Sequence, residues 1–145
     1  MIEIKNKKAL FDYTIFDTYE AGIVLTGTEI KSIREGKANL KDSYAVIKNN
    51  EVYLLNMHIS HYDKGNIFNH DEIRTRKLLL HKKEILKIKD KISIKGFTLV
   101  PIKLYFSKNY AKILLGIGKG KKNYDKRESM KEKTINKEIK KQLSI

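Results

Sequence analysis

Apolar and polar residues alternate in two neighbouring stretches of the chain, residues 100–106 and 111–117. An apolar side chain occupies every second position of both stretches, which is the period of a β-strand with one buried face. The few residues between them are enough for a tight turn but too few for a crossover to a parallel neighbour. The pair therefore predicts a β-hairpin, and with it an antiparallel fold.

Further strands are predicted by the same alternation at residues 11–15, 19–26, 43–48 and 51–58. Asn49 and Asn50 separate the last two, and asparagine tolerates the positive φ of a tight hairpin turn. Gly22 lies inside one of these stretches, which predicts a β-bulge or a close backbone approach.

Two helices are predicted. In residues 26–36, Thr26 and Glu29 have the spacing of a capping box and Gly36 can end the helix. In residues 77–96, isoleucines at helical spacing form one apolar face opposite lysines, and Gly96 ends the pattern.

The fold class that follows is mainly β: an antiparallel, OB-like, six-stranded barrel with flanking helices, formed by residues 1–120. Residues 121–145 have few apolar side chains, too few for a core of their own. We predict that this segment is a basic tail that is flexible alone and becomes helical on a partner.

The charge of the chain indicates a polyanionic partner. Lys and Arg number 31 against 17 Asp and Glu, which gives a net charge of +14. The basic residues are spread over strands, loops and helices with aromatics between them, which favours nucleic acid over a membrane surface. No apolar run is long enough to span a bilayer, and no cysteine is present. We therefore expect a cytoplasmic protein without a membrane partner.

Several basic residues are candidates for phosphate contacts. They lie in the sequence RTRK, on a predicted strand and where the last strand ends: Arg74, Arg76, Lys77, Lys112, Lys119, Lys121 and Lys122. Structured RNA suits this chain better than duplex DNA, because no recognition helix is evident and RNA loops offer unstacked bases.

Enzymatic function has weaker support. The glycine-rich stretch GIGKGKK (116–122) lacks the Ser or Thr of a Walker loop and the third glycine of a dinucleotide loop. Residues 56–71 are rich in His, and a metal-dependent ribonuclease using His58, His61, His70 and Asp71 is the alternative reading. Their spacing matches no common zinc motif, so we expect no catalytic residue, metal or cofactor.

Longer blocks of the sequence resemble one family. They are YEAGIVLTGTEIKSIREGKANLKDSYA (19–45), NMHIS (56–60), RTRKLLLHKKEI (74–85), GFTLVPIKLYF (96–106) and GIGKGKKNYDKR (116–127). These blocks are similar to the small protein B (SmpB) family, the SsrA-binding proteins of bacteria. The resemblance implies an OB-like barrel that binds the tRNA-like domain of transfer-messenger RNA (tmRNA) and delivers it to stalled ribosomes in trans-translation, acting as a monomer without a cofactor.

The resemblance also implies roles for individual residues. RNA binding falls on Glu20, Leu79 and Lys112 and on the basic residues of the strand exit. A tail that occupies the empty messenger channel and contacts small-subunit rRNA at the decoding centre comprises Tyr124, Asp125, Lys126, Arg127, Ile139 and Leu143. The chain differs from the family at Leu10 and Phe11, where an Arg and a His are common.

Overall fold

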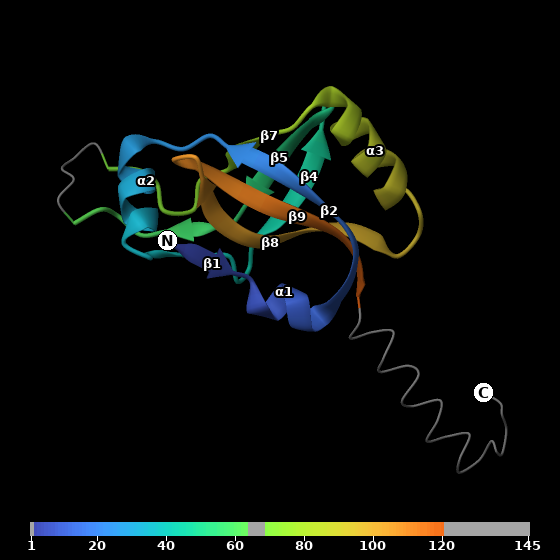
Figure 1. The fold of residues 1–145 in the computed structure, drawn as a ribbon, viewed down its shortest axis with the longest axis horizontal. Coiled ribbons are helices and arrows are strands. Elements are labelled where there is room, and N and C mark those ends of the chain that lie inside the picture. The colour runs from blue at the N-terminus through green and yellow to red at the C-terminus, as the bar shows by residue number, and fades with distance from the viewer. Residues whose placement is uncertain (1, 64–68, 121–145) are drawn as a thin grey trace, which may run out of the picture.

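The computed structural model describes residues 2–63 and 69–120 of the chain. It contains more elements than the sequence predicts (Figure 1). The helices are α1 (Lys7–Asp12), α2 (Gly27–Arg34) and α3 (Lys82–Ile92). The strands are β1 (Glu3–Lys5), β2 (Tyr13–Ile23), β3 (Ala38–Asn39), β4 (Tyr44–Lys48), β5 (Glu51–Leu55), β6 (His58–Ile59), β7 (Arg76–Leu79), β8 (Phe97–Ser107) and β9 (Tyr110–Gly120).

Seven of the strands form one antiparallel sheet in the order β1-β8-β9-β2-β7-β5-β4, and β3 pairs separately with β6. The mainly β, antiparallel prediction is confirmed. The sheet curls until β4, at one edge, comes close to β8, near the other edge. Within the described residues no ladder joins β4 to β8 or β1, so this sheet is open and not a closed six-stranded barrel.

The hairpins form where the sequence places them. Asn49 and Asn50 have φ of 53° and 60° between β4 and β5, and Lys108 and Asn109 have φ of 52° and 70° between β8 and β9. Two successive positive φ values give a turn whose twist matches that of the strands. Both predicted hairpins are confirmed.

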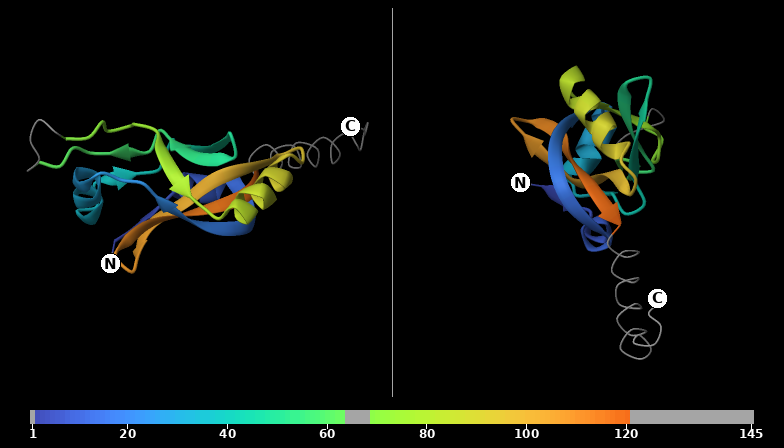
Figure 2. Two further views of the ribbon diagram at one scale, coloured as in Figure 1. Left: turned by 90° about the horizontal axis from the view of Figure 1, so that it is seen from above. Right: turned by 90° about the vertical axis from the view of Figure 1, so that its right-hand side faces the viewer.

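The core lies inside the curl of the sheet and is closed by helices. Alternate residues of β9, including Ile113, Leu115 and Ile117, contribute fully buried side chains. Ile85 and Ile88 of α3 and Ile33 of α2 join the same cluster. Figures 1 and 2 show α2 and α3 at opposite ends of the long strands. The predicted flanking helices are therefore present, each with one apolar face on the core.

A β-bulge divides β2 into two halves. The ladder with β9 shifts register between Ile15 and Asp17, so the bulge is at Phe16. Of the two possibilities that the sequence offers for Gly22, a bulge or a close backbone approach, the bulge is wrong, because neither ladder shifts register at Gly22. Ile15 lies over Gly116, where an added Cβ would stand 2.6 Å from the Cδ1 atom of Ile102. The same added Cβ would stand 3.0 Å from the Cγ2 atom of Ile15, so glycine at this position leaves room for both isoleucine side chains.

Two predicted elements are wrong at their boundaries. The sequence predicts a helix over residues 77–96, but Arg76–Leu79 form β7, which pairs with β2 and β5. The helix begins only at Lys82, where the backbone N–H of His81 donates to Glu84. Residues 7–12 form α1, which the alternation at 11–15 conceals, and the Asn6 side chain caps this helix.

Candidate nucleic-acid interface

Three of the predicted RNA-binding residues meet in one surface hollow. Glu20 comes from β2, Leu79 from β7 and Lys112 from β9, and together with Gly22, Leu80, His81 and Glu84 they line a space of about 430 Å³. The strand register produces this meeting, because Gly22 is paired with Leu79 on one side and with Lys112 on the other. We call this the Glu20 hollow.

Leu79 is half exposed although it is apolar. It is 51% exposed at the end of β7, while its neighbour Leu78 is buried in the core. Leu79 leans over Gly22, where an added Cβ would stand 3.4 Å from the Leu79 Cβ. Leu79 is therefore not a core residue, and its side chain is available to an apolar surface such as the face of a base.

Glu20 is held in place by a tyrosine. The Tyr105 hydroxyl of β8 donates a short hydrogen bond to the Glu20 carboxylate, and the Lys103 ammonium lies 5.2 Å from the centre of the Tyr105 ring. Burial and the neighbouring carboxylate raise the pKa of Tyr105, so its hydroxyl keeps its proton and remains a donor. The carboxylate has acceptor capacity left for amino groups of a base or a ribose 2′-hydroxyl.

The basic residues do not form one cluster. Lys119 lies at the far end of β9 from Lys112, about 23 Å away at strand spacing, with its ammonium 4.8 Å from the centre of the Phe97 ring. Lys77 is on the same face of β7 as Leu79 and pairs with Glu51 at 3.5 Å. Predicted site residues at positions 121 and beyond, namely Lys121, Lys122, Tyr124, Asp125, Lys126, Arg127, Ile139 and Leu143, lie outside the described residues.

Arg76 is not a surface residue, and its prediction as a phosphate contact is wrong. Its side chain is fully buried, and its Nε donates to the Glu29 carboxylate at 2.7 Å. Its Nη1 donates to the Met57 carbonyl at 2.6 Å. With its guanidinium satisfied inside the protein, Arg76 has no donor directed at solvent RNA.

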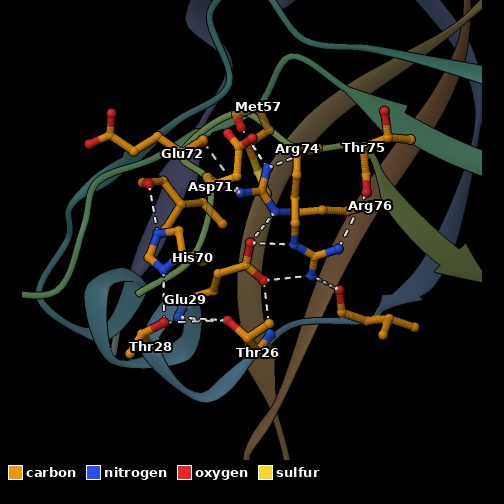
Figure 3. Close-up of polar contacts among 12 residues, drawn as sticks. Thr26, Thr28, Glu29, Met57, His70, Asp71, Glu72, Arg74, Thr75 and Arg76 are labelled. Atoms are coloured by element: carbon orange, nitrogen blue, oxygen red, sulfur yellow. Dashed lines mark hydrogen bonds and ion pairs between the residues drawn. The ribbon is translucent and has the colours of Figure 1, made fainter. Parts of the chain in front are cut away.

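Arg74 binds the same Glu29 carboxylate (Figure 3), but its own side chain is 31% exposed. Its Nη2 and Nε donate to the two oxygens of Glu29 at 2.8 and 3.0 Å, a bidentate pair. Glu29 also accepts the backbone N–H of Thr26 at 2.8 Å, which completes the predicted capping box of α2. The network fixes α2 to β7, the strand that carries Leu79, so Glu29 has a structural role beyond the capping box that the sequence predicts.

The histidines do not assemble into a metal site. Within the part of the chain that the structure describes, no group of three or more His, Asp or Glu side chains is placed to hold an ion. His70 is buried, with Nδ1 2.9 Å from the Thr28 hydroxyl and Nε2 2.9 Å from the Ile59 carbonyl. A carbonyl only accepts, so Nε2 donates, and in the neutral ring Nδ1 accepts from Thr28. Both nitrogens are thus occupied (Figure 3).

None of the described helices is long and apolar enough to cross a membrane. Leu10 and Phe11, the two positions at which the chain differs from the sequence common in the family, lie on α1 and are 41% and 74% exposed.

Together, the fold and the Glu20 hollow define a small, basic, antiparallel β protein whose surface is suited to RNA. Comparison with known proteins gives the family. The family model described as "SmpB protein" matches residues 3–145, and the chain belongs to the SmpB family.

Relatives agree with this assignment. SsrA-binding proteins of two Staphylococcus aureus strains, Newman and USA300, are each 58% identical over 135 residues, which is 93% of this chain and 88% of theirs. One similar solved structure is described as "tmRNA-SmpB: a journey to the center of the bacterial ribosome". It has a TM-score of 0.71 and 48% identity, covering 83% of this chain and 85% of that one.

Proposed function

We propose that this protein is an RNA-binding adaptor that binds the tRNA-like domain of tmRNA and delivers it to stalled ribosomes for trans-translation. The observation that carries the proposal is the Glu20 hollow, in which three strands bring together an acid, a leucine and a lysine. The names of its relatives, SsrA-binding protein and tmRNA-SmpB, give the partner.

Each residue of the hollow has a distinct task in this proposal. Lys112 contacts a phosphate, and Leu79 packs against the face of an unstacked base. Glu20 accepts hydrogen bonds from base amino groups or a 2′-hydroxyl, and Tyr105 holds its carboxylate in position. Structured RNA is preferred because a loop presents bases that a duplex conceals. Lys77, on the same face of β7 as Leu79, adds a phosphate contact beside the Glu20 hollow. Lys119, Lys121 and Lys122 add phosphate contacts farther away, where β9 ends.

The two segments of the chain divide the work. Residues 1–120 form the RNA-binding domain, and the way that β4 approaches β8 supports an OB-like barrel. Residues 121–145 occupy the empty messenger channel and become helical there. In that segment, Tyr124 stacks on decoding-centre RNA, the run from Asp125 to Arg127 begins the helix, and Ile139 and Leu143 form its apolar stripe. The protein acts as a monomer in the cytoplasm.

A metal-dependent ribonuclease is the weaker alternative, and no observation in the described residues favours it. The two ring nitrogens of His70 are both hydrogen-bonded inside the protein, so this residue offers no lone pair to an ion. Incubating the protein with RNA and a divalent ion separates the two functions. Intact RNA supports the adaptor, and cleavage abolished by a chelator supports the nuclease.

Binding to the tRNA-like domain is expected to be tight and strongly salt-dependent. If the protein neutralises about five phosphates, log K plotted against log salt has a slope of about −3.5 to −4.5, because each contact releases counterions. Filter binding or fluorescence anisotropy across a salt series measures this slope. A flat response, or equal affinity for an unrelated duplex of the same length, contradicts the proposal.

A further inference from the structure

A second hollow lies farther along β2 and β9, next to the C-terminal end of α3. It has a volume of about 260 Å³ and is lined by Phe16, Asp17, Lys91, Ile94, Phe97 and Ile117. None of these residues lines the Glu20 hollow. We call this space the Phe16 hollow. Its walls are mainly apolar, and the Lys91 ammonium, paired with Asp17, stands among them.

The bulge in β2 explains why an aromatic ring stands at this surface. Phe16 is the extra residue at the register shift, and a bulge re-aims the side chain that it carries. Phe16 remains 59% exposed, with its ring 5.4 Å from that of Phe97 in an edge-to-face arrangement. Ile94, beside them, is 57% exposed. A cluster of exposed apolar side chains around a hollow is typical of a binding site.

The charge around the Phe16 hollow indicates which kind of ligand binds there. Lys91 lines the hollow and is paired with Asp17, and Lys95 directly follows the lining residue Ile94 in the chain. Lys119 places a further positive charge 4.8 Å from the centre of the Phe97 ring. The chain's own residues 121–145 carry nine Lys and Arg against four acids, so this basic surface repels them. A nucleotide fits both the apolar walls and the positive charge of the Phe16 hollow, since it joins a flat aromatic base to a negative phosphate.

We propose that the Phe16 hollow binds one unstacked base of the bound RNA, which stacks on Phe16 while its phosphate lies at Lys119. The inference rests on the proposed RNA-binding function and adds a second contact area to it. Stacking accepts any base, because every base has a π face. The hollow therefore strengthens binding to RNA with an unpaired nucleotide without reading its sequence.

The test compares the affinity of the wild type and two variants for a transcript of the tmRNA tRNA-like domain. Phe16→Ala is expected to weaken binding about tenfold, the loss of one base–aromatic stack. Its salt slope should equal that of the wild type, because no phosphate contact is removed. Ile73→Ala is the matched control: Ile73 is 56% exposed and lines neither hollow. Both variants should keep the wild-type melting temperature.

The outcomes separate this inference from the proposed function. If the wild type does not bind the transcript, the proposed function is wrong. If the wild type binds and Phe16→Ala binds equally well, only the Phe16 hollow is wrong. A photo-crosslinker, p-benzoyl-phenylalanine in place of Phe16, identifies the occupant directly. With saturating RNA it should crosslink to a nucleotide; a crosslink to residues 121–145 instead, or none to RNA, overturns the proposal.

Discussion

Glu29→Gln is expected to lower the free energy of unfolding by about 3–5 kcal/mol, the cost of removing one partner from a buried ion pair. Glu29 is fully buried and its carboxylate accepts hydrogen bonds from Arg74, Arg76 and the Thr26 backbone. The amide keeps the shape of the side chain but removes the negative charge, so the buried Arg76 guanidinium loses its counter-ion. Urea denaturation followed by circular dichroism measures the change.

A matched control lies at the end of the same helix. Glu35 is exposed and pairs with Lys37 at 3.4 Å, a surface ion pair of the kind that contributes at most about 1 kcal/mol. Glu35→Gln should therefore unfold close to the wild-type midpoint. Equal losses of stability in the two variants would show that the buried network does not hold α2 to β7.

The same network gives the wild type a defined response to acid. Burial raises the pKa of Glu29, but hydrogen bonds from Arg74, the Thr26 amide and Arg76 outweigh it, and the pKa falls below its ordinary value of 4.5. A group with a lowered folded-state pKa stabilises the protein above its unfolded pKa and loses that contribution as pH falls through the folded one. The stability difference between wild type and Glu29→Gln should thus be largest near neutral pH and shrink in acid below pH 4.5.

Deleting residues 121–145 is expected to abolish ribosome rescue while the protein still binds the tRNA-like domain. In the proposed division of work, the Glu20 hollow recognises RNA and the deleted segment occupies the messenger channel. An in vitro translation reaction on a truncated message, supplied with tmRNA, measures rescue as tagging of the stalled peptide. RNA affinity is measured in parallel by anisotropy.

The deletion also removes nine basic residues, so some loss of affinity through lost phosphate contacts is expected. A variant that keeps the charge separates this effect from the decoding role. Tyr124→Ala removes the proposed stacking ring without changing charge, and should reduce rescue while leaving RNA affinity unchanged. If the deletion loses RNA binding and rescue together, while Tyr124→Ala loses neither, the division of work is wrong.

Local patterns in the sequence predict the hairpins and the helix caps because these depend on neighbouring residues. Asn49-Asn50 and the Thr26–Glu29 box are of this kind. Residues 77–80 are wrongly predicted to be helical because a short apolar run is compatible with a buried strand as well as with a helix. These residues form a strand because β7 pairs with β2 and β5, and both partners are distant in the sequence.

The candidate site likewise combines features that local sequence patterns predict with features that depend on long-range contacts. The sequence RTRK predicts a basic surface, but Arg76 is buried because Glu29, far away in the chain, reaches it. No local pattern indicates that pairing. Similarly, nothing in the spacing of Glu20, Leu79 and Lys112 predicts that they meet, and only the family resemblance names them together. Phe16 has a weak local signal: an aromatic ring at a polar position of an alternating strand.

The most direct test of the adaptor function is to isolate the protein from its own cells and sequence the RNA that it carries. The salt used in the isolation must be low enough to preserve phosphate contacts. We predict strong enrichment of tmRNA over transfer RNAs and messenger fragments, and loss of that enrichment when Glu20 and Lys112 are both replaced by Ala. RNA recovered in proportion to its cellular abundance, unchanged by the double substitution, would contradict the proposed function.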